Sequence, residues 1–445
     1  MTQTVPPKSL AAQAQRFGLR ALTKVGGLPV MNRPEVRHRL ERALYETSRQ
    51  GFRLADAAAS RRSFPTRAAD GQPVRAAVTR PGRLFDLTPT QDQAMLRDAA
   101  RELAEEVIRP AGAQADTDRA VPGTVRKAAA EMGLVLLGVP AELDGIAEER
   151  SAVATCLVLA ELARGDMGIA AALMAPAAVA GALAAYGTAA QQATYLPAFT
   201  GDNPPSYAAL ALMEPQPLFD PLAPRTVGAT RGGDLVLDGV KALVPGAESA
   251  ELLIVSALVD GVPRLVIVEP ATPGVTVEDD PAMGLRAART GRVVMRDVVV
   301  PLANLLGNTE DHLDAVRRAR LAWAAMACGT AQAVLDQLIP YVKERKAFGE
   351  AIGRRQAVAF TIADIAVELD ALRLVTWKAA ARLDHGLDAA PLIANARALT
   401  ARHGAWIGSS AVQMLGGHGF VKEFDNERWF RDLRGAGLLE GALLA

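Results

Sequence analysis

Apolar and polar positions follow two different periods along this chain. From about residue 85 to 206, and again from about residue 309 onward, apolar side chains recur every three or four residues, as in amphipathic helices. Between residues 207 and 303 the pattern changes to short runs rich in Val and Leu, separated by Gly, Pro and Asp, which predict strands and turns. The two periods predict a multidomain helical fold with a β-insert.

We therefore expect four parts. Residues 1–84 form an N-terminal arm and linker, residues 85–206 an all-helical domain, and residues 207–303 a small antiparallel β-barrel or sandwich. Residues 304–445 are expected to form a C-terminal four-helix bundle, because long helical segments with short connections pack as antiparallel neighbours.

Local signals set the expected ends of these elements. Thr88-Pro89-Thr90-Gln91 predicts a helix start with Thr88 as the N-cap, and Pro110 predicts the end of that helix. Further helices are expected at 123–132, 148–165, 167–186, 188–198, 309–345, 352–385, 390–416 and 427–433, and strands at 235–237, 252–258, 265–268 and 293–300.

The uncharged run from Met167 to Ala190 is long enough to cross a membrane. Alanine dominates it, and Gly168, Pro176 and Gly181 are expected to interrupt it. We interpret this run as a buried helical core and expect no transmembrane segment.

The arm differs from the rest of the chain in charge. Residues 1–84 carry 16 Lys and Arg against 5 Asp and Glu, whereas the whole chain of 445 residues has zero net charge. The arm could dock on the enzyme body, contact an anionic membrane or partner surface peripherally, or act as a mitochondrial transit peptide. Its apolar spacing favours a folded accessory element, with residues 65–82 as the linker.

Composition excludes several classes of function. A neutral chain argues against binding to nucleic acid. Cys156 and Cys328 are the only cysteines, and no His cluster has metal-ligand spacing, so neither a disulfide framework nor a zinc site is predicted. A reducing cytoplasm is the expected location, or the mitochondrial matrix if the chain is eukaryotic.

The most informative stretch lies near the C-terminal end. Gly416, Gly417 and Gly419 surround His418, and such a glycine cluster lets the backbone approach a ligand closely. Further on, Glu440 stands among apolar residues. Burial there would raise the pKa of this carboxylate toward the range of a general base, whereas the alternative is a solvent-facing Glu on a short helix.

Two motifs resemble those of the acyl-CoA dehydrogenases. The C-terminal one combines Gln413, the Gly-Gly-x-Gly-aromatic turn, Arg431-Asp432 and Glu440-Gly441. The upstream one is Arg345-Lys346-Ala347-Phe348-Gly349, followed by Gln356. The motifs have the order and the approximate spacing of that family, and lesser matches run from about residue 85 to the end.

The resemblance implies FAD as cofactor and an acyl-CoA as substrate. It implies that Glu440 takes the substrate's α-proton, that Arg320 and Gly441 belong to the substrate site, and that a homodimer or homotetramer passes electrons to an electron-transferring flavoprotein. The residues implied to contact the flavin nucleotide, some across a subunit interface, are Arg345, Phe348, Gln356, Gln413, Gly416 and Gly417, with Met213 in the loop that covers the flavin.

Arg320 has a second interpretation, as part of a surface basic cluster with Arg317 and Arg318. Some family members carry their catalytic Glu one residue before this Arg, but Ala319 stands there, so Glu440 is the candidate base.

Several positions depart from the family pattern. Met213 and Phe219 replace hydroxyl residues of the flavin-covering loop, Leu243 replaces a flavin-stacking aromatic residue, and Pro245 replaces a further hydroxyl residue. Each lost hydroxyl removes a potential hydrogen bond of about 1 kcal/mol to the cofactor. The chain also stops soon after Glu440, where the family usually continues with another helix, so either another part of the chain, such as the N-terminal arm, replaces that helix or the site is less enclosed.

The reaction implied is α,β-dehydrogenation of an acyl thioester. Two alternatives stay open at this point: a flavin oxidase or monooxygenase of the same fold, and a cofactor-poor relative that binds acyl thioesters or a partner subunit.

Overall fold

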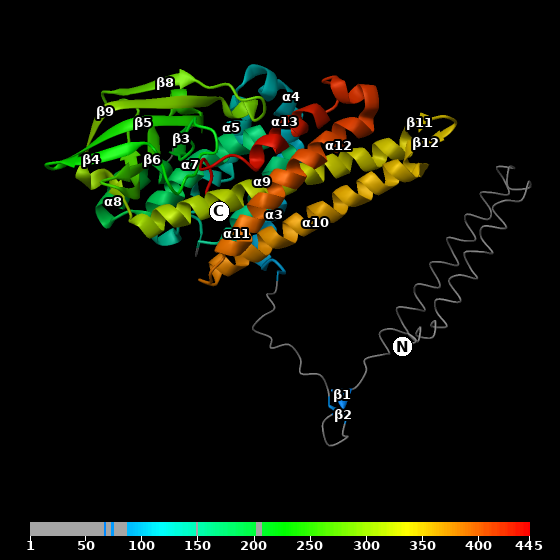
Figure 1. Ribbon diagram of the computed structural model, residues 1–445, viewed down its shortest axis with the longest axis horizontal. Helices are drawn as coiled ribbons and strands as arrows, with labels where there is room; N and C mark the ends of the chain where they lie inside the picture. Colours follow the sequence, from blue (N-terminus) through cyan, green and yellow to red (C-terminus); the bar gives the residue numbers. More distant parts are fainter. Residues whose placement is uncertain (1–65, 68–72, 75–86, 148–149, 202–206) are drawn as a thin grey trace, which may run out of the picture. The chain divides into compact units, whose positions relative to one another are not determined.

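The computed structural model describes residues 66–67, 73–74, 87–147, 150–201 and 207–445. Residues 1–84 and 85–445 form two separate units (Figure 1). In the first unit, strand β1 (Thr66–Arg67) pairs antiparallel with β2 (Pro73–Val74), within the stretch expected to be a linker. The folded accessory element expected in the arm falls on residues 1–65, which lie outside the described residues.

The second unit begins with helices α3 (Gln91–Leu103), α4 (Arg109–Asp118) and α5 (Gly123–Glu131). The N-cap of α3 is Thr90 and not Thr88: the Thr90 side chain accepts from the Gln93 N–H, and the Gln93 side chain accepts from the Thr90 N–H. The prediction placed this capping box two residues too early, because the segment contains Thr-x-x-Gln at 88–91 and again at 90–93.

Pro110 does not end the first helix, contrary to the prediction. A π-helical turn over Ala104–Ile108 connects α3 to α4, so helical structure continues to Asp118. Pro110 has no N–H to donate to the preceding turn, and it stands directly after the π-helical turn, where the helix hydrogen-bond pattern already shifts.

Helices α6 (Ala152–Gly165), α7 (Met167–Tyr186) and α8 (Ala189–Thr200) complete the N-terminal part. Helix α7 is long and apolar enough to cross a membrane, yet 94% of its apolar window is buried inside the protein. This burial agrees with the interpretation as a core helix. The expected interruption is absent, since α7 continues through Pro176.

The middle part is an eight-stranded sheet (Figure 1). Its strands are β3 (Ala208–Ala211), β4 (Val227–Arg231), β5 (Asp234–Pro245), β6 (Leu252–Val259), β7 (Val262–Val268), β8 (Val275–Asp279), β9 (Thr290–Pro301) and β10 (Leu305–Leu306). Pairing is antiparallel except that β3 and β4 both run parallel to β6. Alternate residues of the central strands pack into an apolar core, as the period of two requires.

One buried ion pair lies within this sheet. Lys241 Nζ lies 2.8 Å from Glu214 Oε1 and donates to Ser256 Oγ at 3.0 Å. Glu214 also accepts from the backbone N–H groups of Arg225 and Thr226. These bonds offset the free-energy cost of removing both charged groups from water.

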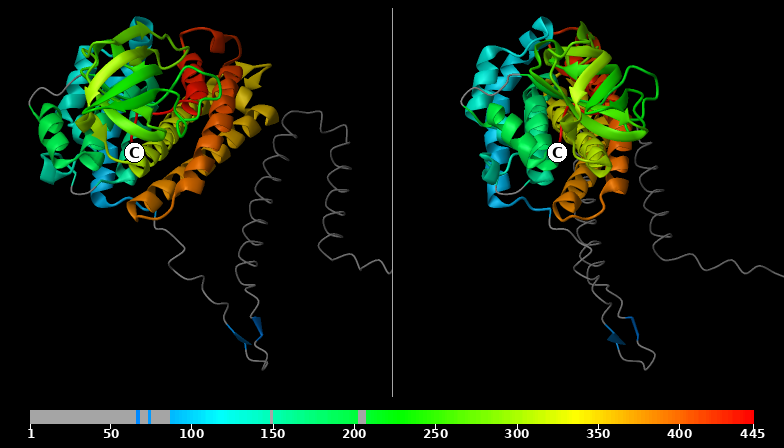
Figure 2. Two further views of the ribbon diagram at one scale, coloured as in Figure 1. Left: turned by 60° about the vertical axis from the view of Figure 1, so that its left-hand side comes forward. Right: turned by 90° about the vertical axis from the view of Figure 1, so that its left-hand side faces the viewer.

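The C-terminal part contains α9 (Thr309–Glu344), α10 (Gln356–Asp384), α11 (Ala390–Leu399), α12 (Ala405–Leu415) and α13 (Asn426–Ala436). A short hairpin of β11 (Lys346–Ala347) and β12 (Glu350–Ala351) joins α9 to α10. A second π-helical turn at Thr400–Gly404 connects α11 to α12. Figure 2 shows the last residues of the chain where α9, the N-terminal helices and the sheet meet.

Candidate active site

The segment after α13 carries Glu440 into the interior. Its side chain is buried, with 4% of the residue exposed, and the segment is not helical, so the alternative of a solvent-facing Glu on a helix is wrong. Gly441 has a φ of +71°, and a Cβ added there would lie 2.7 Å from the carbonyl oxygen of Leu210. The next residue, Ala442, donates its N–H to that carbonyl at 2.8 Å, which ties the segment to β3.

Two arginines from different helices contact the Glu440 carboxylate. Arg320 of α9 donates from Nε to Oε1 at 3.1 Å and to Oε2 at 3.0 Å, and from Nη2 to Oε1 at 2.9 Å. Arg397 of α11 places Nη2 2.6 Å from Oε1. Arg320 thus lies at Glu440, while Arg318 pairs with Asp314, so the two do not form one surface cluster.

Burial and charge act in opposite directions on Glu440. Burial raises the pKa of its carboxyl above the ordinary value, whereas hydrogen bonds from Arg320 and the positive charge of Arg397 oppose that increase. The negative charge of Asp220 adds a smaller upward contribution to the pKa. Burial prevails, and the result is a desolvated carboxylate with raised basicity.

The apolar surroundings differ in part from the expectation. Leu439, Leu443 and Leu444 are buried near Glu440 in sequence, but Leu438 is 64% exposed and does not exclude water from the site. On the helix α9 side, Trp323 lies one turn beyond Arg320 and donates from Nε1 to the carbonyl oxygen of Gly441 at 3.0 Å. Trp323 therefore fixes the backbone directly after the candidate base.

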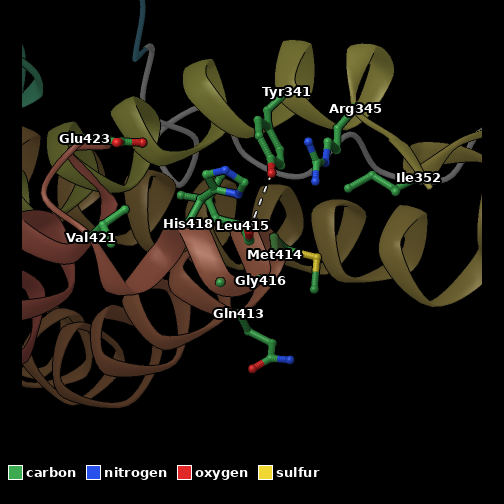
Figure 3. A pocket seen from close by; sticks show the side chains of 11 residues that line it. Tyr341, Arg345, Ile352, Gln413, Met414, Leu415, Gly416, His418, Val421 and Glu423 are labelled. Carbon is green, nitrogen blue, oxygen red and sulfur yellow. Dashed lines mark hydrogen bonds between the residues drawn. The ribbon is translucent and has the colours of Figure 1, made fainter.

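A second group of predicted residues lines a cavity of about 670 Å³ where the C-terminal part of α9 meets the end of α12 (Figure 3). Arg345, Gln413, Gly416 and Gly417 line it, as do Tyr341, Ile352, Met414, Leu415, His418, Val421 and Glu423. Tyr341 of α9 and Arg345, which directly follows α9, point toward the glycine turn (Figure 3), and the Tyr341 hydroxyl donates to the carbonyl oxygen of Leu415 at 3.4 Å. Glu440 does not line this cavity.

The remaining predicted cofactor residues lie outside this cavity. Phe348 sits in the β11–β12 turn and is 91% exposed, and Gln356 is exposed at the start of α10. Met213 follows β3 and accepts a backbone hydrogen bond from Ala242 at 2.9 Å.

Arg431 and Asp432 do not pair with each other, although they were described together in the motif. Arg431 binds Asp116 and Glu427, and Asp432 accepts from the N–H of Leu285 at 2.6 Å. These contacts join α13 to helix α4 and to the connection between β8 and β9.

The lining of the cavity fits the nucleotide half of FAD. A Cβ added at Gly416 or Gly417 would meet no atom within 4 Å, so both backbones are open to a ligand. Arg345 supplies an exposed cation of the kind that binds phosphate. The residues that depart from the family pattern, Met213, Phe219, Leu243 and Pro245, do not line this cavity.

Sequence reasoning missed two residues of the Glu440 site. Arg397 and Trp323 both bind backbone carbonyls of the 438–441 segment. An arginine inside an alanine-rich helix, and a tryptophan three residues after Arg320, were the available signals. Neither signal indicates which distant segment the side chain contacts.

Comparison with known proteins decides the family. The N-terminal, middle and C-terminal domains of the acyl-CoA dehydrogenases match residues 90–202, 209–298 and 312–443. The chain belongs to the acyl-CoA dehydrogenase family. The expected family and fold class are thereby confirmed, and so is FAD as the cofactor of this family. An acyl-CoA dehydrogenase is an oxidoreductase that acts on the CH–CH group of its donor.

Similar proteins include the mitochondrial short-chain specific acyl-CoA dehydrogenase of Bos taurus, 31% identical over 78% of this chain and 86% of that protein. The NADH-dependent acryloyl-CoA reductase of Anaerotignum propionicum is 30% identical over 80% of this chain and 93% of its own length. The structure of butyryl-CoA dehydrogenase from Megasphaera elsdenii superposes with a TM-score of 0.71 at 25% identity, covering 79% of this chain and 95% of that one.

Proposed function

We propose that this acyl-CoA dehydrogenase removes hydrogen from the α and β carbons of an acyl-CoA thioester, with Glu440 as the base for the α-proton. The observation that carries the proposal is the buried carboxylate of Glu440, held by Arg320 and Arg397. When bound, FAD would accept the β-hydrogen as a hydride. We propose that Arg320 and Gly441 border the acyl thioester.

The charges around Glu440 suit proton abstraction. Before the reaction, the Glu440 carboxylate balances part of the positive charge of Arg320 and Arg397. Once it takes the proton, the negative charge moves to the enolate while both guanidinium groups stay in place. Fixed positive charge near a developing enolate lowers the barrier, because the protein groups need not reorganise.

For the cofactor we propose that Arg345, Gln413, Gly416 and Gly417 hold the nucleotide end, and that Phe348, Gln356 and Met213 complete the site. Arg345, Phe348 and Gln356 are exposed in a single chain, which supports a site shared between two chains. The exposed apolar residues Phe360, Val367 and Leu374 recur every seven positions along α10 and add a surface suited to such an assembly.

We further propose a homodimer or homotetramer that delivers electrons to an electron-transferring flavoprotein, in the cytoplasm or the mitochondrial matrix. The domain limits 85–206, 207–303 and 304–445 remain our proposal for the three parts of the catalytic unit, with 1–84 as an accessory arm.

The deciding experiment follows the flavin. The purified protein should carry FAD or take it up, and an acyl-CoA series of increasing chain length should bleach the flavin under anaerobic conditions. A colourless protein that rejects added FAD would contradict the dehydrogenase and favour an acyl-thioester-binding relative. Rapid reoxidation of the reduced flavin by oxygen would identify an oxidase or monooxygenase.

A further inference from the structure

Arg397 makes more contacts with the Glu440 segment than a simple ion pair requires. Its Nη1 donates to the carbonyl oxygen of Leu439 at 2.9 Å, and its Nη2 donates to the carbonyl oxygen of Leu438 at 3.2 Å. The same Nη2 lies 2.6 Å from Glu440 Oε1. A single planar guanidinium thus contacts three consecutive residues, a geometry that a lysine ammonium cannot reproduce.

The contacts are unevenly divided between the two carboxylate oxygens. Oε1 has three guanidinium nitrogens within 3.1 Å, two from Arg320 and one from Arg397. Oε2 has one such contact in the described part of the chain, with Arg320 Nε at 3.0 Å. A carboxylate oxygen offers two lone-pair directions, so Oε1 is saturated and Oε2 has one left for a proton.

We infer that Arg397 is a positioning residue for the proposed base: it holds the backbone at Leu438 and Leu439 and places a second cation on the Oε1 side, which leaves Oε2 as the oxygen that takes the substrate's proton. This inference rests on the proposed function for its link to catalysis. It concerns a residue of α11 that no part of the family motifs described above contains.

The charged groups that face Glu440 determine how the loss of Arg397 would change the pKa of the Glu440 carboxyl. They are Arg320 on α9, Arg397 on α11 and Asp220 in the loop before β4. In Arg397→Gln one cation disappears while Arg320 and Asp220 stay, so the carboxylate becomes easier to protonate. Arg320 still donates twice to Oε1, but the carbonyl groups of Leu438 and Leu439 lose their guanidinium partner, so the segment is free to carry the carboxylate away from a productive orientation.

The test compares Arg397→Gln, Arg397→Lys and the control Arg402→Gln in the full-length, FAD-loaded protein. Arg402 is an exposed arginine in the π-helical turn that follows α11. One readout is the pH dependence of flavin reduction by acyl-CoA. The other is independent of activity: ¹³C NMR titration of carboxyl-labelled glutamates, with the Glu440 signal assigned by its loss in Glu440→Gln.

For Arg397→Gln we expect the Glu440 titration and the acid limb of the rate profile to move up together by about one pH unit, since an opposite charge at close range shifts a carboxyl by about that much or more. The limiting rate should fall roughly tenfold to a hundredfold from misorientation. Arg397→Lys should restore the titration but only part of the rate, and Arg402→Gln should match the parent.

An equal loss of rate at all pH values in Arg397→Gln, with an unchanged NMR titration, would overturn the inference and reduce Arg397 to a structural residue. If the parent fails to reduce its flavin while the Glu440 titration still moves in Arg397→Gln, the proposed function is wrong and the positioning of Glu440 by Arg397 stands.

Discussion

Arg320 and Glu440 are 120 residues apart in sequence, yet Arg320 Nε and Nη2 donate to both oxygens of the Glu440 carboxylate. The arginine belongs to α9, the longest helix of the described residues, and the carboxylate to the final irregular segment. This pair brings the two ends of the C-terminal bundle together at one buried point. It also holds the carboxylate at a fixed place, which a base acting on a weak carbon acid needs.

Glu440→Gln tests the proposed base directly. Glutamine keeps the shape of the side chain but cannot take a proton, so FAD content should be unchanged and flavin reduction by acyl-CoA should slow by at least ~10²-fold. Stopped-flow reduction measures the rate, and Glu131→Gln, at an exposed glutamate of α5, is the control. If Glu440→Gln reduces its flavin as fast as the parent, another group takes the proton.

Gly441→Ala should impair both stability and turnover. The φ of +71° is unfavourable for alanine, and the new Cβ would lie 2.7 Å from the Leu210 carbonyl oxygen. The segment would have to leave β3 and would carry Glu440 away from Arg320, so we expect a lower melting temperature and a rate loss of roughly 10²-fold. The control is Gly233→Ala, where an added Cβ meets no atom within 4 Å. A Gly441→Ala protein with parental stability and rate would contradict this view of the segment.

The sequence predicted the order and type of the elements because their apolar periods are long and regular. It was less accurate where a local signal had two solutions. Thr88 and Thr90 both begin a capping pattern, and only the packed helix selects Thr90. Pro110 is a helix breaker by its local chemistry, but the π-helical turn at 104–108 accommodates it, which depends on packing that the sequence does not display.

The candidate site, like the fold, was predicted only in part. Glu440 is conspicuous as a charge among leucines, and the resemblance to the family implied Arg320. Arg397 could not be deduced, because its partners lie about 42 residues away on a segment with no regular structure. The side of the segment on which Leu438 lies likewise depends on a single turn of backbone. The apolar pattern predicted that Leu438 would help to bury Glu440, but Leu438 is exposed.

Arg345→Ala should reduce FAD content and weaken assembly together. Arg345 lines the cavity at the Gly416 turn, and the neighbouring Phe348 is exposed in a single chain, as expected of residues that meet a second copy. Analytical ultracentrifugation with absorbance at a flavin wavelength reports both quantities. Lys343→Ala, an exposed residue of the same helix end, should behave like the parent. A parent protein that sediments as a monomer with full flavin occupancy would contradict a shared site.

The ion pair between Glu214 and Lys241 predicts how the protein responds to acid. Both side chains are buried, at 2% and 0% exposed. Burial alone would raise the pKa of Glu214, but the charge of Lys241 and the hydrogen bonds from Lys241 and Thr226 outweigh it and lower the pKa to about 2. Burial lowers the pKa of Lys241 to about 8, so the pair is charged at neutral pH.

The direction of the pH effect follows from the lowered pKa of Glu214. The unfolded chain binds a proton at this carboxyl below about pH 4.5, while the folded chain does not until about pH 2. The stabilisation is therefore present above that range and is lost as the pH falls through it.

Glu214→Gln should lower the free energy of unfolding at pH 7 by about 3 kcal/mol, because Lys241 remains buried without its partner. The variant should also lose less stability than the parent between pH 4.5 and 2. Glu248→Gln, which breaks the exposed pair with Arg289, should change the free energy of unfolding by less than about 0.5 kcal/mol. Urea denaturation at several pH values measures all three proteins, and equal effects of Glu214→Gln and Glu248→Gln would refute a stabilising role for the buried pair.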